Sequence, residues 1–258
     1  PMSKLRLVTS TIRDLSLKGQ LVVIASGLVM LVICGWYSFL FRRKNVRYIL
    51  VAHGIDINPT SRLWRLLVRV GLKGFDVIVP VSSYTASRIG GVANEKLRVI
   101  NNGFDPARFQ QLASLRPVAK KGSPNLITVG SVTYRKGQVN IVKALPTVAK
   151  AYPNVHYHMI GIAQEKDVVL RLAEDLGVDS HITFHGPLSD DALKEQLSAC
   201  DIFVMLSKHD PSGDFEGFGI AVLEANFLGL PAIGSANSGL RDAISPGYSG
   251  FLIQPDDE

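Results

Sequence analysis

Residues 216–224 read Glu-Gly-Phe-Gly-Ile-Ala-Val-Leu-Glu, with two carboxylates eight positions apart and a glycine pair just inside the first. Glycines before a helix let a ligand approach the backbone, and the first helical turn offers unpaired N–H groups to an anion. At a helical rise of ~1.5 Å per residue, Glu216 and Glu224 are at most ~12 Å apart. That span is about the length of a sugar–diphosphate–ribose unit, so the stretch predicts an anion site with a hydroxyl-binding carboxylate at either end.

The rest of the 258-residue chain alternates short apolar runs with stretches of helical periodicity. This regular alternation predicts an α/β fold with a doubly wound parallel sheet, formed twice. A polar tract that includes Pro117, Gly122 and Pro124 separates the two halves, so we expect one domain over 1–117 and a second over 118–258. The main predicted strands are 75–81, 97–100, 125–129, 155–162, 181–184, 202–206, 231–233 and 250–253.

The run Leu21–Phe41 carries no charge and is followed by Arg42, Arg43 and Lys44, which fits a membrane-spanning helix. The same run also divides at Ser26-Gly27 into a β-rich strand and a buried helix, with a second strand at 46–52. We favour this βαβ interpretation because buried parallel strands are continuous apolar runs and the connections are short.

The two halves of the chain differ in charge. Residues 1–117 hold 17 Lys and Arg against 5 Asp and Glu, whereas residues 118–258 hold 11 against 17. A basic half attracts polyanions, anionic lipids or an acidic substrate, although a solvated basic surface without a partner fits equally well. No nucleic-acid motif is present, because the aromatic residues lie in apolar runs rather than between basic ones. The two cysteines form neither a disulfide framework nor a metal cluster, which makes a cytoplasmic location the default expectation.

The segment 216–224 resembles the E-x7-E motif of retaining GT-B glycosyltransferases, in particular glycosyltransferase family 4. Further stretches resemble that family in the same order along the chain: Val-Ser-Ser-Tyr-Thr at 81–85, the hinge segment 99–105, Val-Gly-Ser at 129–131, Arg-Lys-Gly at 135–137, and the strand entries at 184–186 and 229–233. The resemblance implies a GT-B fold, in which two Rossmann-like doubly wound parallel-sheet domains face a cleft. We expect both domains to be incomplete here, because a glycine-rich loop near the start and helices after 258 are missing from the pattern.

The resemblance also implies roles for individual residues of the donor site. Glu224 would hold the nucleotide ribose and Glu216 would contact the transferred sugar. Lys136 would neutralise the diphosphate with help from Arg135, while Ser131 stands where the family has an arginine. Backbone N–H groups would meet the sugar and diphosphate at four further donor-binding positions, Gly217, Phe218, Gly219 and Ile220.

His53 ends the predicted strand 46–52 just before Gly54. Ligands of open α/β sheets bind beyond the carboxyl ends of the strands, so His53 is expected to face the cleft. The resemblance implies that it helps to bind the donor sugar near the reaction centre, which makes His53 and Glu216 the candidate catalytic residues. No Asp-x-Asp motif occurs, and we expect neither a metal nor another cofactor.

The resemblance implies transfer of a hexose from a nucleotide-sugar donor to a glycan or lipid-linked hydroxyl acceptor, with retention of configuration. Glu216 is expected to orient and stabilise charge rather than to act as a covalent nucleophile. The basic half is a candidate contact for an anionic membrane surface, which adds a peripheral location at the inner membrane face to the cytoplasmic expectation. Two alternatives stay open: a nucleotide-sugar-binding fragment without catalysis, and a related GT-B enzyme such as a sugar epimerase.

Overall fold

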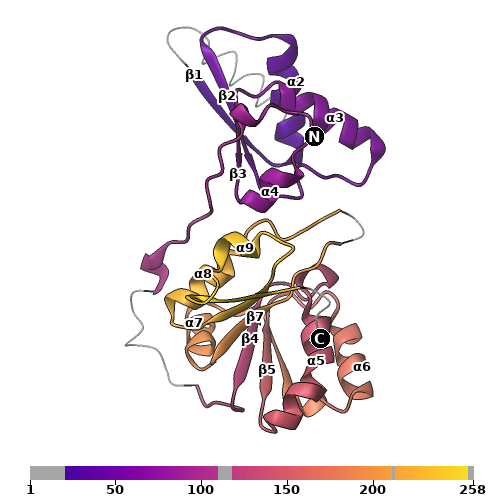
Figure 1. Cartoon of the computed structure of the whole chain (residues 1–258), viewed down its shortest axis with the longest axis vertical. Helices are drawn as coiled ribbons and strands as arrows, with labels where there is room; N and C mark the ends of the chain where they lie inside the picture. Colours follow the sequence, from indigo (N-terminus) through magenta and orange to yellow (C-terminus); the bar gives the residue numbers. More distant parts are fainter. Residues whose placement is uncertain (1–20, 110–117, 211–212, 255–258) are drawn as a thin grey trace. The chain divides into compact units, whose positions relative to one another are not determined.

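The computed structural model describes residues 21–109, 118–210 and 213–254. The chain forms two compact units, shown in Figure 1. The first unit contains Pro1–Asn101 together with Ser212–Gly217, and the second contains Asn102–Pro211 and Phe218–Glu258. The domain boundary predicted at 117/118 adjoins 110–117, which lie outside the described residues, and it stays a prediction.

The first unit is built on a three-stranded parallel sheet with the order β1-β2-β3. The predicted split of the apolar run 21–41 is confirmed, because β1 pairs with β2 along its whole length. No helix in the described part of the chain is long and apolar enough to cross a membrane. The elements of this unit are β1 (Leu21–Ser26), α2 (Leu28–Leu40), β2 (Val46–Ala52), α3 (Arg62–Lys73), β3 (Val77–Pro80), α4 (Ser83–Arg88) and the 3₁₀ turn η1 (Asn94–Lys96).

Helices α2 and α3 pack against each other with their backbones in close approach. A Cβ added at Gly35 of α2 would overlap the carbonyl group of Gly71 on α3, so only glycine fits there. The pair is tied further by hydrogen bonds from Trp36 Nε1 to the Leu67 carbonyl, at 3.0 Å, and from Ser38 Oγ to the Gly74 carbonyl, at 2.8 Å. The two helices therefore form a rigid layer on the sheet.

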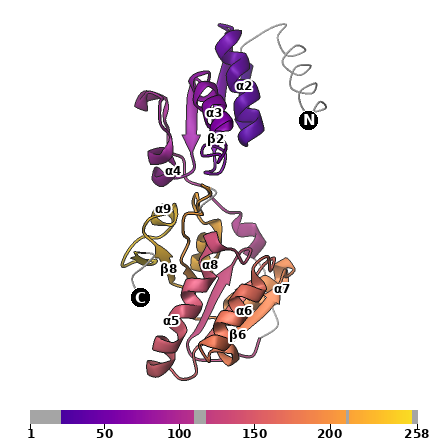
Figure 2. The same cartoon turned by 90° about the vertical axis from the view of Figure 1, so that its right-hand side faces the viewer.

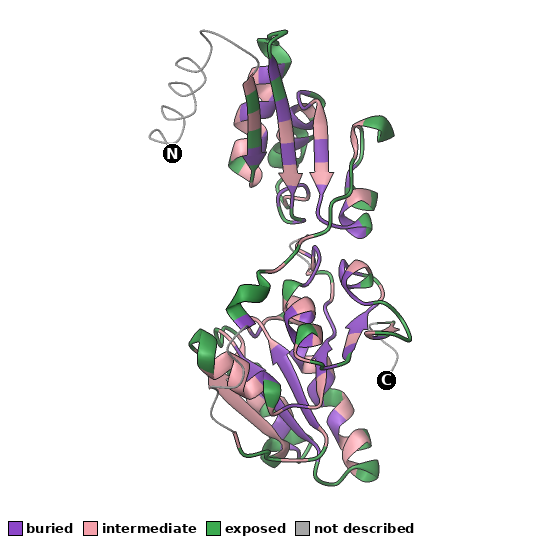
Figure 3. Cartoon of the chain, turned by 90° about the vertical axis from the view of Figure 1, so that its left-hand side faces the viewer, coloured by how far each residue is buried: buried purple, intermediate pink, exposed green. Residues whose placement is uncertain are grey.

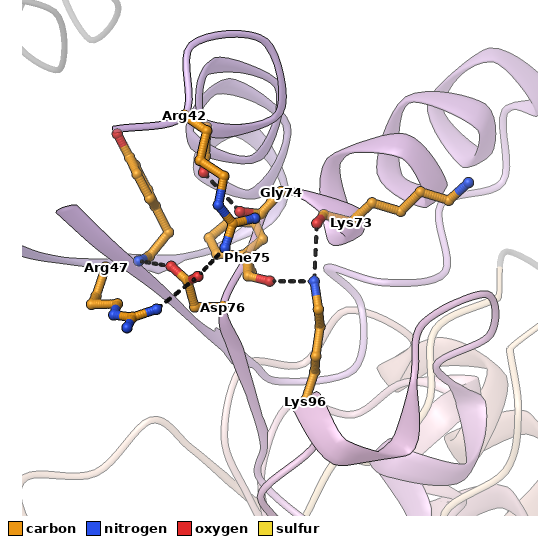
Figure 4. Close-up of polar contacts among 9 residues, drawn as sticks. Arg42, Arg47, Lys73, Gly74, Phe75, Asp76 and Lys96 are labelled. Carbon is orange, nitrogen blue, oxygen red and sulfur yellow. Dashed lines mark hydrogen bonds and ion pairs between the residues drawn. The ribbon is translucent and has the colours of Figure 1, made fainter. Parts of the chain in front are cut away.

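Asp76 ties together the amino ends of β2 and β3, as Figure 4 shows. Its carboxylate accepts a hydrogen bond from the Tyr48 backbone N–H at 2.9 Å and pairs with Arg42 at 2.5 Å and Arg47 at 3.5 Å. Nearby, Lys96 Nζ donates to the carbonyl groups of residues 73 and 75. Part of the positive charge counted in the basic half therefore has a structural role.

The second unit contains a six-stranded parallel sheet with the order β6-β5-β4-β7-β8-β9. Helices α5 and α6 lie on one side of this sheet and α7, α8 and α9 on the other (Figures 1 and 2). The strands are β4 (Asn125–Val129), β5 (His156–Ile160), β6 (Ile182–Gly186), β7 (Ile202–Met205), β8 (Ala232–Ser235) and β9 (Gly250–Ile253). The helices are α5 (Gln138–Ala151), α6 (Lys166–Asp175), α7 (Asp190–Ser198), α8 (Ile220–Phe227) and α9 (Leu240–Ala243), with 3₁₀ turns η2 (Pro106–Phe109), η4 (Tyr134–Lys136) and η5 (Asp179–His181). The α/β class with parallel sheets is thus confirmed.

The two sheets differ in burial, as Figure 3 shows. Every residue of β5, an inner strand of the second unit's sheet, is buried, because helices lie on both sides of that sheet. Its core includes a polar pair in which the Tyr157 hydroxyl donates to Thr128 Oγ1 at 2.8 Å, and Thr128 donates to the Val204 carbonyl. Strand β1 of the first unit instead alternates partly buried and exposed residues, with Val22 and Ile24 exposed.

Two local predictions differ from the structure. Residues 97–100 are not a strand: Arg98 and Ile100 donate to β3 carbonyls, but the contact amounts to a single bridge at Leu97. Helix α8 begins only at Ile220, so Glu216 lies before the helix and the helical estimate of the Glu216–Glu224 span does not apply.

Candidate functional site

The strand order of the second unit reverses between β4 and β7, which lie side by side. Ligands of open α/β sheets bind at such a switch point, beyond the carboxyl ends of the strands. Lys136 stands there: its side chain lies against Gly130, the residue after β4, and its Nζ is 3.8 Å from Sδ of Met205 at the end of β7. The lysine charge is thus held at the edge where the fold places a ligand.

The loop that carries Lys136 is held by short-range bonds. Thr133 caps the turn η4 by accepting from the Lys136 backbone N–H. Gln138, which is almost fully buried, donates to the Ser131 carbonyl at 3.1 Å. The Arg135 carbonyl accepts from the Lys208 backbone N–H at 2.8 Å, which links the loop to the segment after β7.

Helix α8 starts at the same edge of the sheet. Its N-cap residue is Gly219, which has a φ of 89°, and an added Cβ there would overlap Leu240. Phe218 is buried in the core, while Ile220 is 40% exposed. The structure therefore presents the first-turn N–H groups of α8 after a glycine that no other residue could replace without strain.

Glu224 lies on α8 and is buried, with only 10% of its side chain exposed. Its Oε1 atom accepts from Nη1 of Arg108 at 2.8 Å. Burial raises the pKa of Glu224 above its ordinary value, although the charge of Arg108 and the hydrogen bond from it act in the opposite direction. The carboxylate predicted to hold a ribose is thus a desolvated group with a cationic neighbour.

Three of the predicted site residues belong to the first unit: His53, Glu216 and Gly217. His53 follows β2 directly, is exposed, and donates its backbone N–H to the Asp56 carboxylate at 3.3 Å. The Gly217 backbone packs against the His53 carbonyl so closely that a Cβ would overlap it, and the Gly217 carbonyl accepts from Thr85 Oγ1 at 3.3 Å. Phe215 anchors the same segment in the core beside Tyr84. The structure therefore brings His53 next to Gly217, which directly follows Glu216 in the chain.

The nine-residue motif is divided between the units. Glu216 and Gly217 belong to the first unit, and residues 218–224 belong to the second. Arg108 and Asp190 were not among the predicted site residues, although Arg108 lies just after the hinge segment and Asp190 opens helix α7. Among the described residues, no group of three or more His, Cys, Asp or Glu side chains could hold a metal ion.

Two family models match the chain. The model described as glycosyl transferases group 1 covers residues 113–258, and that described as Glycosyltransferase Family 4 covers residues 13–108. The chain belongs to the glycosyl transferases group 1 family. Its neighbours among solved structures support the predicted GT-B fold for this family member. One is a glycosyltransferase from Rickettsia africae, with a TM-score of 0.76 and 20% identity, covering 99% of this chain and 67% of that one. Another is Anabaena HepE in complex with UDP, with a TM-score of 0.73 and 22% identity, covering 98% and 68%.

Curated relatives in the family include a GDP-mannose-dependent alpha-(1-6)-phosphatidylinositol monomannoside mannosyltransferase from Mycobacterium tuberculosis. It is 30% identical over 219 residues, which is 80% of this chain and 56% of the relative. A putative colanic acid biosynthesis glycosyltransferase, WcaL, from Escherichia coli is 27% identical over 80% of this chain and 51% of its own length. This glycosyl transferases group 1 chain thus spans about half the length of these relatives.

Proposed function

We propose that the protein transfers a hexose from a nucleotide-sugar donor to a hydroxyl of a glycan or lipid-linked acceptor, with retention of configuration. One observation carries the proposal. At the switch point of the six-stranded sheet, Lys136 and the glycine-capped start of α8 occupy the same edge, and α8 carries the buried Glu224. A cation, a row of backbone donors and a hydroxyl-binding carboxylate are the groups that a nucleoside diphosphate requires.

Each group has a part in the transfer. Glu224 accepts hydrogen bonds from the ribose hydroxyls, which leaves the diphosphate to the N–H groups of α8 and to Lys136 and Arg135. As the glycosidic bond breaks, the diphosphate gains negative charge, and the cations and helix dipole stabilise it. His53 helps to bind the donor sugar, and Glu216 orients the sugar and stabilises positive charge at its anomeric carbon.

The donor is tested by binding and turnover of the purified chain. GDP-mannose comes first because the Mycobacterium tuberculosis relative is named for it, and UDP-glucose is the comparison because HepE is described with UDP-glucose. We expect Glu224→Gln to weaken binding of either nucleotide by at least tenfold, about 1.4 kcal/mol. Glu216→Ala should leave nucleotide affinity close to that of the wild type but abolish turnover, as expected for a residue that contacts only the sugar.

The stereochemical part has its own readout, because proton NMR of the product distinguishes an α from a β linkage. A wild-type chain that binds nucleotide yet neither hydrolyses nor transfers any donor would reduce the proposal to a binding protein. A chain that binds no nucleotide at all would overturn it.

On the proposed acceptor side, the start of α3 is a candidate surface for binding a membrane. Leu63, Trp64 and Leu66 are exposed there by 64%, 37% and 57%. Arg62, Arg65 and Arg69 lie on the same helix and, within the described residues, make no ion pair. Apolar side chains between unpaired arginines suit the interface of an anionic bilayer, where each arginine contributes ~1 kcal/mol.

Vesicle sedimentation tests this part separately. We expect the chain to bind vesicles that contain 30% phosphatidylglycerol and to release them as salt rises, while neutral phosphatidylcholine vesicles bind weakly. Trp64→Ser with Leu66→Ser should reduce binding, and Arg98→Gln, an exposed arginine outside α3, should not. Equal binding to both kinds of vesicle would contradict the charge argument.

A further inference from the structure

The turn η2 carries an arginine that joins two carboxylates of the second unit. Arg108 donates through Nη1 to Oε1 of Glu224 at 2.8 Å. Its other edge binds the Asp190 carboxylate through two bonds, from Nη2 at 2.7 Å and from Nε at 3.2 Å. Such a two-point contact holds a guanidinium in one plane, so Asp190 sets the orientation in which Arg108 meets Glu224.

The position of Arg108 follows from its local sequence. Asp105 begins the turn. Its side chain accepts a hydrogen bond from the Ala107 backbone N–H at 2.9 Å, and its backbone carbonyl accepts one from the Arg108 backbone N–H at 3.2 Å. The turn is anchored on α8 by three aromatic rings, Phe104, Phe109 and Phe227, whose centroids lie 5.3–5.9 Å apart. Because Phe227 is three residues after Glu224, the same face of α8 holds both the turn and the carboxylate.

We infer that Arg108 is a positioning residue for donor binding, which keeps the buried carboxylate of Glu224 ionised and in one orientation so that its second oxygen accepts the ribose hydroxyls. This inference rests on the proposed function. Within the described residues, Oε2 of Glu224 accepts no hydrogen bond, so Arg108 uses one oxygen and leaves the other for a ligand. An arginine that merely filled the ribose position would instead compete with the donor.

The electrostatics agree with this role. Burial is the largest influence on Glu224 and raises its pKa, whereas Arg108 lowers it and Asp190 raises it slightly. Strand β8 and helix α9 also pack on α8, and the charged groups of α9, Arg241 and Asp242, pair with each other at 3.9 Å. Removal of Arg108 would therefore raise the pKa of Glu224 further and leave a buried carboxyl that protonates more easily.

The experiment compares GDP with 2′,3′-dideoxy-GDP, and UDP with its dideoxy form, by calorimetry between pH 5.5 and 8.5. We expect Arg108→Gln to weaken GDP or UDP binding roughly tenfold at the acidic end of this range, and to recover part of that loss as the pH rises, because a larger fraction of Glu224 is then ionised. Dideoxy nucleotides should show little change, because they lack the hydroxyls that Glu224 holds. Arg108→Lys should bind nucleotide more tightly than Arg108→Gln, since lysine keeps the positive charge but cannot make the planar two-point contact.

Control variants distinguish a failure of this positioning role from a failure of the proposed function. Arg171→Gln removes an exposed arginine from α6 and should leave binding unchanged at every pH. The double variant with Glu224→Gln and Arg108→Gln should bind nucleotide no more weakly than Glu224→Gln alone, because both changes act on one contact. If wild type binds nucleotide and Arg108→Gln binds equally well or more tightly, the positioning role is wrong and the proposed function stands. If wild type binds no nucleotide, both fall.

Discussion

The two units achieve stability in different ways. In the first, two helices meet backbone to backbone through Gly35 and Gly71, and a single aspartate holds the strand ends. In the second, large buried side chains fill the core, and buried histidines and hydroxyls lie among them. The first unit is therefore sensitive to added volume, and the second to a change of protonation.

Both tryptophans, Trp36 and Trp64, lie in the first unit. Tryptophan fluorescence therefore reports on that unit alone, while far-UV circular dichroism reports on both. This separation allows each of the following predictions to be assigned to one unit.

The largest effect is expected for Gly35→Val. The new side chain would overlap the Gly71 carbonyl, and two helix backbones would have to move apart, so we expect a loss of about 3 kcal/mol in the free energy of unfolding. Denaturant unfolding followed by tryptophan fluorescence measures it. Gly90→Ala, which has open space around it, is the matched control. A variant as stable as wild type would show that the helix contact is adaptable.

The second largest effect is expected from acid, which should lower the stability of the second unit. Burial lowers the pKa of His156 and His158 to about 4, with smaller contributions from Lys121 and His185 on both, from His181 on His156 and from His156 on His158. Because both residues are neutral in the folded unit and titrate near pH 6.5 when unfolded, their contribution to stability is complete above pH 6.5. It is lost as the pH falls from there toward 4.

The measurement is the urea midpoint at pH 7 and pH 5, by circular dichroism and by fluorescence. We expect the circular dichroism transition to shift to lower urea at pH 5 more than the fluorescence transition does. His156→Gln with His158→Gln should flatten that dependence. Equal shifts of both signals would remove the contrast between the units.

A smaller effect is expected at Asp76. Asp76→Ala leaves the Tyr48 backbone N–H without its partner and should cost about 1–2 kcal/mol in the free energy of unfolding. Asp76→Asn keeps an acceptor and loses only the pairs with Arg42 and Arg47, which are more than half exposed, so its cost should be lower. If the two variants lose the same stability by fluorescence, the ion pairs rather than the backbone bond hold the strand ends.

The smallest effect is expected for Ser207→Ala in the second unit. The Ser207 hydroxyl is buried and, within the described residues, has no hydrogen-bond partner. Its removal takes away an unsatisfied polar group, so the free energy of unfolding should stay within about 0.5 kcal/mol of wild type or rise. A loss above 1 kcal/mol by circular dichroism would reveal a partner for this hydroxyl.

Much of the fold could be predicted from the sequence. The division of 21–41 into strand and helix, and the alternation that builds both sheets, follow from local periodicity and from Gly27. The error at 97–100 has a tertiary cause, because an apolar run becomes a strand only when a full ladder is available, and β3 offers only two carbonyls. Within the site, Lys136 and the glycines before α8 were recognised because a loop or helix start is a local feature.

The sequence by itself determined the order of strands and helices, the family and the motif Glu216–Glu224, because periodicity and spacing act over a few residues. Only the tertiary structure decided that the motif is shared between two units, that Gly217 packs on the His53 carbonyl, and that Arg108 pairs with Glu224. Arg108 and Glu224 are 116 positions apart. Contacts at such separation depend on how the sheet orders its strands and on which helix face remains open, and no local pattern encodes either.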